Sequence, residues 1–412
     1  MSRPLHRFAA AVAAAFLPFA ASAQQKVTGP IAQYWVSAET AAGVDMGAMG
    51  GGLGGMMMGR MMGGAGGDAG KRLVLKLGSS QAAPADPRAQ HDVPPALSMG
   101  ASLPLLTPRA ERAAREPGDL PQGMERPRGR MLIFWGCGES ARPGQPVVID
   151  FAKVAQGQMP PGFGTRRVNA PNPPAFGRSR GYGDWPNSED SRPVPANASL
   201  RGDHVVKGNY SPEIRFAVGE RHDFMERVTL SSGATPSGAV ALRWNALGNA
   251  TGYFAMVTGG NDREEVVFWT SSESQDLGGS LMDYVPPGEA ARLVREKVVL
   301  APQVTECTVP AEVVKAAPAA FLSFVAYGDE LNVVHPPRPQ DPSRTWEQVY
   351  TVKVRLKSTA SMLLSEGGMA AGQGDRRARQ SAQDPAPPSG DAPASSNPVD
   401  QGIGILRGIL GR

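Results

Sequence analysis

Short blocks of apolar residues, bounded by Gly, Pro or polar turns, make up the ordered part of this sequence. Met131–Trp135 and Val147–Phe151 form the most compact apolar pair and predict two strands. Ile31–Glu39 and Lys71–Leu77 have strand composition, and the Gly- and Met-rich stretch 43–70 lies between them. Because Gly loses much conformational entropy on ordering, we expect this stretch to be a long loop that joins two strands.

The second half of the chain carries the clearest strand pattern. Seven short strand-like runs, most of them separated by turn residues, lie at 227–230, 239–244, 252–258, 265–270, 304–309, 320–327 and 349–356. This number and spacing predict a Greek-key β-sandwich. We expect one helix to interrupt it at Gly288–Lys297, because proline is favoured in the first turn of a helix and Pro286-Pro287 precedes this segment.

These patterns predict a mainly β fold with two β-sandwich-like domains, long Gly- and Pro-rich loops and a disordered C-terminal tail. The first domain is expected over residues 24–225 and includes an irregular loop at 156–203. The second is expected over 226–358. Residues 359–401 are rich in Gly, Ala, Ser, Pro and Gln and predict a disordered linker, and 402–412 form a short amphipathic tail.

Part of the second domain resembles a known family. Residues Val240–Val257 are similar to the second and third strands of fibronectin type III domains, in which a core Trp ends one strand and a buried Tyr opens the next. Trp244 and Tyr253 take those two positions, and Ala320–Tyr327 resembles the late aromatic strand of the family. The resemblance covers about 227–358, and the helix expected near 288–297 departs from it. It implies a binding or spacer module and carries over no catalytic residue.

The N-terminus has the three parts of a secretory signal peptide. Basic residues precede the apolar run Phe8–Phe19, and Ala21-Ser22-Ala23 is a small-residue cleavage site. The run is too short for a transmembrane helix, so residues 1–23 predict export. The Ala, Gly, Arg and Pro bias favours a bacterial periplasm or outer-membrane surface. Removing Arg3 and Arg7 lowers the formal net charge from +4 to +2, which gives no support for nucleic acid as a partner.

Cys137 and Cys307 are the only cysteines of the chain. In an oxidising compartment they are candidates for a disulfide between two distant segments, with two separate buried thiols as the alternative. Cys137 lies between Gly136 and Gly138 and is also a candidate nucleophile. No histidine stands at a recognised spacing from it, so a structural role is favoured over catalysis.

Metal binding is a further hypothesis, because Met thioethers are soft ligands that suit Cu(I). Met46 and Met49, and likewise Met58 and Met61, have an i, i+3 spacing that lets two sulfurs share one ion. The stretch holds no His or Cys and is diluted by Gly, so a flexible low-complexity insertion is the favoured interpretation and copper the alternative.

Two further features are candidate sites. The pairs Asp203-His204 and His222-Asp223 bracket a strand-like segment, but without zinc-type spacing they are expected to face water. The apolar residues of the C-terminal tail lie close to one face at helical spacing and are candidates for contact with a membrane surface or a partner, with a frayed tail as the alternative. These residues are Ile403, Leu406, Ile409 and Leu410.

Three functional hypotheses remain. The first is an exported, non-enzymatic envelope protein that binds a protein, a glycan or the envelope surface. The second is a periplasmic copper-binding protein that uses the Met-rich loop. The third is a hydrolase with a site built from loops such as 156–203.

Overall fold

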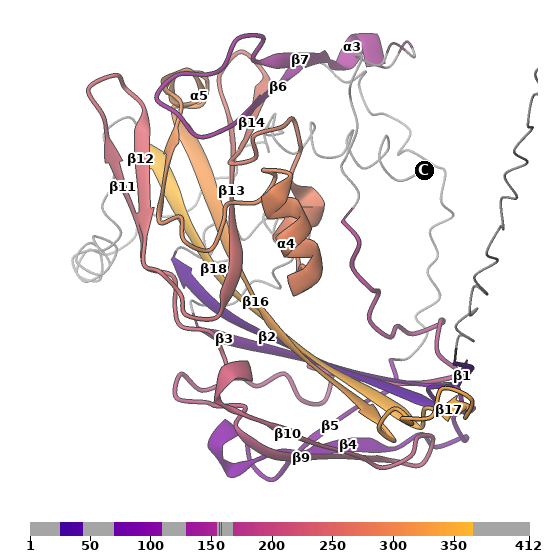
Figure 1. Cartoon of the computed structure of the whole chain (residues 1–412). Coiled ribbons are helices and arrows are strands. Elements are labelled where there is room, and N and C mark those ends of the chain that lie inside the picture. The colour runs from indigo at the N-terminus through magenta and orange to yellow at the C-terminus, as the bar shows by residue number, and fades with distance from the viewer. Residues whose placement is uncertain are drawn as a thin grey trace, which may run out of the picture.

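The computed structural model describes residues 25–43, 70–108, 129–154, 156, 158 and 168–365. The fold is mainly β, as expected. Its strands form sheets of nine, four and three strands and a two-stranded ribbon. In Figure 1 the long strands of the nine-stranded sheet cross the molecule diagonally, with the four-stranded sheet below them and helix α4 (Pro287–Arg295) above.

The nine-stranded sheet has the order β7-β6-β14-β13-β16-β18-β2-β3-β8. In that order its strands are Val147–Asp150, Arg130–Trp135, Glu265–Thr270, Ala250–Gly260, Ala319–His335, Tyr350–Ser365, Ala32–Gly43, Lys71–Ser79 and Gly181–Trp185. The β6–β14 and β2–β18 pairs are parallel and the other pairs are antiparallel. Strands from both sides of the boundary expected at residue 225 belong to this sheet, so that boundary does not separate the sheets.

The smaller sheets pack on one side of the large one. The four-stranded sheet has the order β10-β9-β4-β5, with strands Ile214–Val218, Gly202–Gly208, Ala89–Asp92 and Ser102–Pro104. The three-stranded sheet has the order β11-β12-β15, with strands Leu230–Ala234, Val240–Trp244 and Glu306–Val309. The ribbon pairs β1 (Val27–Thr28) with β17 (Trp346–Glu347). The remaining elements are α3 (Phe151–Val154), α5 (Ala311–Ala316) and the 3-10 turns η1 (Pro95–Leu97), η2 (Glu220–His222) and η3 (Gly279–Met282).

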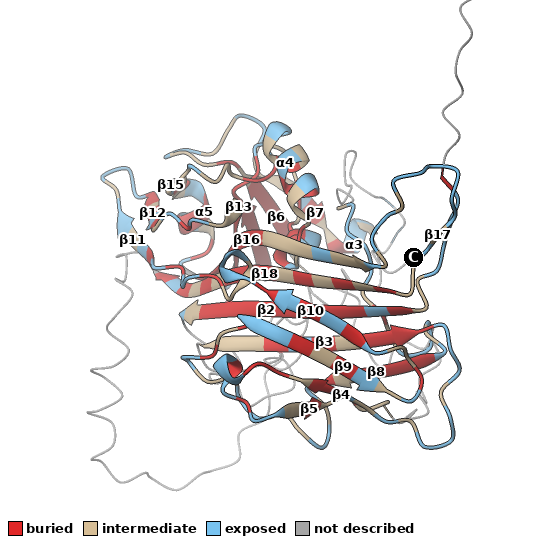
Figure 2. Ribbon diagram, turned by 60° about the horizontal axis from the view of Figure 1, so that its bottom comes forward, coloured by how far each residue is buried: buried red, intermediate tan, exposed pale blue. Residues whose placement is uncertain are grey.

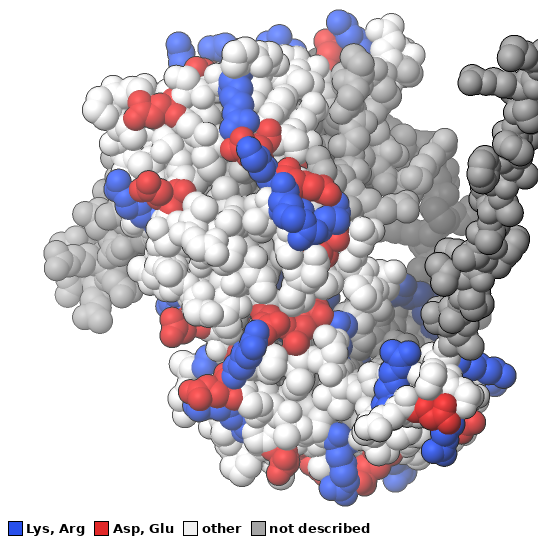
Figure 3. Space-filling view, in the orientation of Figure 1, with Lys and Arg blue, Asp and Glu red and all other residues white. Residues whose placement is uncertain are grey.

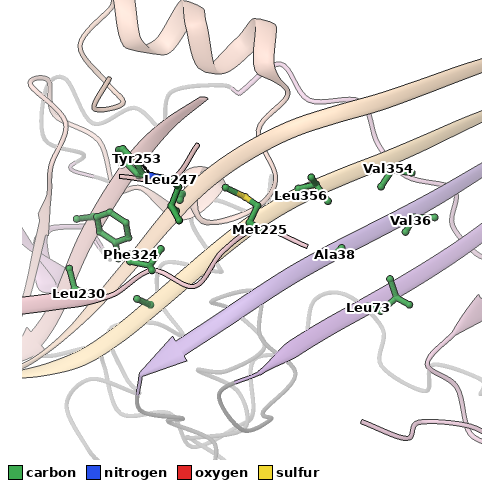
Figure 4. Packing of buried hydrophobic residues seen from close by; sticks show 14 of the residues in the cluster. Val36, Ala38, Leu73, Met225, Leu230, Leu247, Tyr253, Phe324, Val354 and Leu356 are labelled. Carbon is green, nitrogen blue, oxygen red and sulfur yellow. Dashed lines mark hydrogen bonds between the residues drawn. The ribbon is translucent and has the colours of Figure 1, made fainter. Parts of the chain in front are cut away.

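Strict alternation along β18 gives the nine-stranded sheet two different faces. Val354 and Leu356 enter the largest hydrophobic core, which also contains buried residues of the four-stranded and three-stranded sheets. We call this side the inner face, and Figure 4 shows part of its packing. Arg355 and Lys357 point to the opposite side, the outer face, because successive strand residues point to opposite sides. Figure 2 shows β2 buried along most of its length.

A second and a third hydrophobic cluster cover part of the outer face. Leu293 of helix α4 and Leu281 of the η3 turn pack in one cluster with Phe254 of β13 and with buried residues of β16. Phe151, which follows β7, packs with residues of β6 and β14. The helix expected at Gly288–Lys297 is therefore present as α4, and its apolar residues lie against the sheet.

The seven expected strands of the second half correspond to seven observed strands with corrected bounds. β11 begins at Leu230, where the first run was expected to end, and β16 and β18 extend to His335 and Ser365. The linker expected from residue 359 therefore does not begin there. The first, second and fifth of these strands form the three-stranded sheet, and the other four are adjacent in the nine-stranded sheet.

Two further expectations are corrected in the first half. The segment His204–Val218 is a hairpin of two strands, β9 and β10. The loop expected at 156–203 contains β8, which the low strand propensity of Gly181 and Gly183 concealed. A Cβ at position 183 would lie 2.5 Å from the Tyr210 hydroxyl, so glycine is required for the tyrosine to pack on this strand.

Candidate functional site

A row of polar and aromatic side chains crosses the outer face from β18 to β8. The strand register places Lys353 opposite Trp35, Trp35 opposite Lys76, and Lys76 opposite Asp184. Arg355 and Lys357 lie further along the same face of β18. This outer-face row is the candidate functional site.

Each cation that β18 contributes has partners. The Lys353 ammonium donates to Glu330 Oε2 at 2.5 Å and lies 5.5 Å from the Trp35 ring centroid. Arg355 donates through Nε to Ser37 Oγ at 2.7 Å, and its guanidinium lies 5.1 Å from the Trp35 ring centroid. Trp35 is therefore held by two cation–π contacts, which are attractive because of the ring quadrupole.

The loop after η3 is fixed on this row by two of these cations. The Tyr284 ring centroid lies 4.1 Å from the Arg355 guanidinium carbon and 4.8 Å from the Lys357 ammonium. Lys357 also donates to the Met282 carbonyl at 3.3 Å and lies 3.7 Å from Glu39 Oε2. Burial, together with the Glu39 charge, raises the pKa of the Tyr284 phenol well above its usual value. This end of the row is a closed, internally satisfied network.

Lys76 differs from the other cations of the row. Its side chain is half-buried on β3, and the described part of the chain provides no hydrogen-bond or ion-pair partner for its ammonium. Burial lowers the Lys76 pKa, and the nearby Arg355 and Arg178 charges lower it further, against the opposing charges of Asp184 and Asp283. A half-buried lysine that has no hydrogen-bond acceptor in the described chain lacks the stabilisation that a charge-assisted hydrogen bond gives the other cations of the row.

The neighbours of Lys76 on β8 are also perturbed. Tyr182 donates its hydroxyl to Asp184 Oδ2 at 3.1 Å. Burial raises the pKa of the Asp184 carboxyl, although the Tyr182 hydrogen bond and the Lys76 charge act in the other direction. Burial and the Asp184 charge raise the pKa of Tyr182. Perturbed titratable groups that share one surface are a feature of functional sites, although ion-pair networks perturb pKa values too.

An exposed aromatic ring lies beside this end of the row. Phe176 is 48% exposed, and its ring centroid lies 6.4 Å from that of Tyr182 in an edge-on arrangement. Figure 3 shows charges of both signs on the face of the molecule that carries α4. The charges that act on Lys76 are likewise of both signs, since Arg355 and Arg178 are opposed by Asp184 and Asp283.

The two cysteines are joined. Cys137 follows β6, Cys307 lies in β15, and the disulfide between them spans 170 residues. Gly138 donates its backbone N–H to the Thr308 carbonyl at 2.9 Å beside the bridge. The disulfide thus links the nine-stranded sheet to the three-stranded sheet, and Cys137 has no thiol that could act as a nucleophile.

The two Asp-His pairs have separate environments. His204 is buried and bonded to His91 and to the Leu200 carbonyl, whereas Asp203 is exposed. His222 lies 3.8 Å from Asp329, and the neighbouring Asp223 carboxylate accepts hydrogen bonds from residues 199 and 200. The structure does not bring the two pairs together into one site.

The remaining sequence candidates fall outside the described residues. These are Met46, Met49, Met58 and Met61 of the Met-rich loop and Ile403, Leu406, Ile409 and Leu410 of the tail. The Met-rich stretch lies in the sequence between β2 and β3, which pair antiparallel with each other. Within the described ranges, no group of three or more His, Cys, Asp or Glu is arranged to hold a metal ion. No helix there is long and apolar enough to cross a membrane.

Comparison with known proteins adds no assignment. No protein-family model, curated protein or solved structure matches the chain.

Sequence reasoning missed the outer-face row, although part of its signal was available. The alternation Lys353, Arg355, Lys357 in β18 indicates one charged strand face. The partners of that face come from β2, β3 and β8, and β8 was not expected as a strand. The lack of a partner for Lys76 in the described chain becomes apparent only when β2, β3 and β8 are paired in the sheet.

Proposed function

We propose that this protein is an exported, non-enzymatic binding protein of the bacterial envelope that recognises an anionic saccharide on its outer-face row. The observation that carries the proposal is the half-buried Lys76 side chain, which has no hydrogen-bond or ion-pair partner among the described residues, in a row where the β18 cations do have partners.

The disulfide supports export. Disulfides persist in secreted and periplasmic proteins and are rare in the bacterial cytoplasm, where thiols are kept reduced. The Cys137–Cys307 bridge has its Cα atoms 5.3 Å apart, within the range usual for disulfides. It agrees with the signal peptide expected at residues 1–23.

The arrangement of the seven strands in the second half supports a binding module of the fibronectin type III kind. Immunoglobulin-like sandwiches place their first, second and fifth strands in one sheet and their third, sixth and seventh in the other. The strands from β11 to β18 are distributed in this way, with β14 beside the third strand. The Trp244 and Tyr253 rings on which the resemblance rests are 5.6 Å apart in the core.

An oxyanion supplies the hydrogen-bond acceptor that Lys76 lacks within the described chain. A carboxylate or phosphate placed there accepts hydrogen bonds from the ammonium, and it also reduces the repulsion between Lys76, Arg355 and Arg178. A saccharide is the proposed carrier because the exposed Phe176 ring offers an apolar surface next to the polar Tyr182–Asp184 pair. Binding sites commonly combine an apolar aromatic surface with a few polar groups that fix orientation.

Calorimetric titration tests this proposal. Oligogalacturonate supplies carboxylates, a phosphorylated oligosaccharide supplies phosphates, and maltohexaose is the neutral control. We expect one of the anionic ligands to bind and maltohexaose not to bind. Lys76→Gln should weaken that binding about 10- to 100-fold, since a hydrogen bond to a charged group contributes about 1.5–3 kcal/mol. Higher salt should weaken it as well.

A matched control is available in Lys207→Gln. Lys207 is an exposed lysine of β9 that pairs with Asp92 at 2.7 Å on the four-stranded sheet, away from the row. Its replacement should leave the affinity unchanged. Equal loss of affinity in both variants, or equal binding of the neutral and anionic ligands, would contradict the proposal.

A further inference from the structure

A buried chain of hydrogen bonds connects the nine-stranded sheet to the four-stranded sheet. Tyr34 of β2 is bonded through its hydroxyl to His91 Nδ1 at 2.8 Å, and His91 Nε2 is bonded to His204 Nδ1 at 2.9 Å. His204 Nε2 is bonded to the Leu200 carbonyl at 2.7 Å. His91 lies in β4 and His204 in β9, and all three side chains are at most 1% exposed.

The direction of every bond in this chain is determined. A carbonyl only accepts, so His204 Nε2 carries a hydrogen and Nδ1 of the neutral ring is the acceptor. His91 Nε2 must therefore donate to His204, which leaves His91 Nδ1 as the acceptor of the Tyr34 hydroxyl hydrogen. Two neutral imidazoles in this chain therefore each carry the proton on Nε2, and each ring nitrogen has one partner.

An additional proton disrupts this chain. A proton on His204 Nδ1 faces the N–H of His91, so that two donors meet. A proton on His91 Nδ1 faces the Tyr34 oxygen, whose own hydrogen must then turn away into the core. Either event also places a charge in a buried site packed by Phe216, whose ring is stacked 4.7 Å from the His204 ring. Burying an uncompensated charge is strongly unfavourable.

Among the described residues, no nearby acid compensates that charge from within the core. Asp203 acts on His204 but is exposed on the far side of β9. Asp92, next to His91 on β4, pairs with Lys207 of β9 on the outside of the four-stranded sheet. Arg215, next to Phe216 on β10, pairs with Glu213 at the surface.

We propose that this Tyr34–His91–His204 chain is a pH-sensitive junction that releases the four-stranded sheet from the nine-stranded sheet in mildly acidic surroundings. The proposal is independent of saccharide binding on the outer face. It gives an exported protein a response to external acidity located on the inner face of the large sheet.

The sign and range of the effect follow from the two imidazoles. Burial, and for His91 the His204 charge, lowers the pKa of His91 well below its usual 6.5. Burial also lowers the His204 pKa, although the Leu200 carbonyl and Asp203 oppose this. An open or unfolded form therefore binds more protons below pH 6.5. The junction is fully stable above about pH 6.5. As the pH falls from 6.5 toward the lowered pKa values of His91 and His204, the equilibrium constant for closing the junction decreases up to about tenfold per pH unit for each histidine.

Hydrogen exchange with mass spectrometry at pH 7.0 and pH 5.5, corrected for the intrinsic exchange rate, tests the junction. Amides of β4, β9 and β10 should open about 10- to 100-fold more often at pH 5.5, while those of β13 and β16 change much less. The corresponding control is His222→Gln, which removes an imidazole that is not part of the Tyr34–His91–His204 chain and should leave this contrast intact. A uniform change in all strands, or no change, would overturn the proposal.

A second measurement does not depend on any variant. The nitrogen chemical shifts of the two imidazoles at pH 7.0 report protonation and tautomer directly. We expect His91 and His204 both to be neutral with the proton on Nε2, and their signals to remain so until the junction opens. A charged ring, or a proton on Nδ1 of either ring, at pH 7.0 would contradict the structural basis of the proposal.

A variant of the chain itself extends the hydrogen-exchange test. His91→Gln, if it folds, should reduce the pH contrast by about tenfold per pH unit.

Discussion

Replacement of both Cys137 and Cys307 by Ala is expected to lower the free energy of unfolding by about 3–5 kcal/mol. The bridge closes a loop of 170 residues, so its removal greatly increases the conformational freedom of the unfolded chain. It also removes the covalent link between the end of β6 and β15. For a protein of this size the loss corresponds to a decrease in melting temperature of roughly 5–8 °C.

Thermal and urea denaturation of the purified mature protein would measure this loss. The wild-type protein treated with reductant should approach the stability of the double variant, and reductant should not affect the variant itself. Alkylation of the denatured, unreduced protein should modify neither cysteine. Alkylation of both cysteines in the denatured, unreduced protein would show that the bridge is absent. Equal stability of variant and wild type would show that the bridge does not stabilise the fold.

A second large effect is expected at the aromatic centre of the core. Phe324 of β16 is fully buried, and its ring centroid lies 4.7 Å from that of Trp244 and 5.8 Å from that of Tyr253. It thus joins the nine-stranded sheet to the three-stranded sheet, as Figure 4 shows in part. Phe324→Ala removes these contacts and leaves a cavity, which should cost about 3–5 kcal/mol.

Two matched variants make this result specific. Phe324→Leu keeps most of the volume and should cost clearly less than Phe324→Ala. Leu363 lies in β18 and is 39% exposed, so Leu363→Ala should change the stability little. Urea denaturation followed by tryptophan fluorescence measures all three. A similar loss for Phe324→Ala and Leu363→Ala would contradict the role of Phe324 at the sheet interface.

Local patterns predicted much of the fold. The strands around Trp244 and Tyr253, helix α4 and the individual strands β2 and β3 each produce a signal within a few residues. Such signals depend on alternation, turn residues and proline position, which are encoded locally. The fold class was therefore predictable, and the predicted strands of the second half are observed as strands even where their ends differ.

The joining of the two halves into one sheet was not predictable in this way. The parallel pairs β18–β2 and β14–β6 connect strands that are about 300 and about 130 residues apart in the sequence. Nothing in either segment specifies such a distant neighbour. The candidate site shares this limit, since Trp35, Lys76 and Arg355 become neighbours only through these pairings. His91 was likewise missed because β4 lies in a Pro- and Ala-rich stretch.

Selective modification of Lys76 tests the proposed binding face most directly. The lowered pKa of Lys76 leaves more of its amine unprotonated than in an ordinary lysine, so an acylating reagent at pH 8 should modify it readily where the reagent has access. Peptide mass mapping measures its rate of acylation with and without the anionic saccharide that binds in calorimetry. At about ten times the dissociation constant, that ligand should slow the acylation of Lys76 about tenfold and leave Lys207 unaffected. Unchanged acylation of Lys76 while the ligand is bound would place the binding site elsewhere.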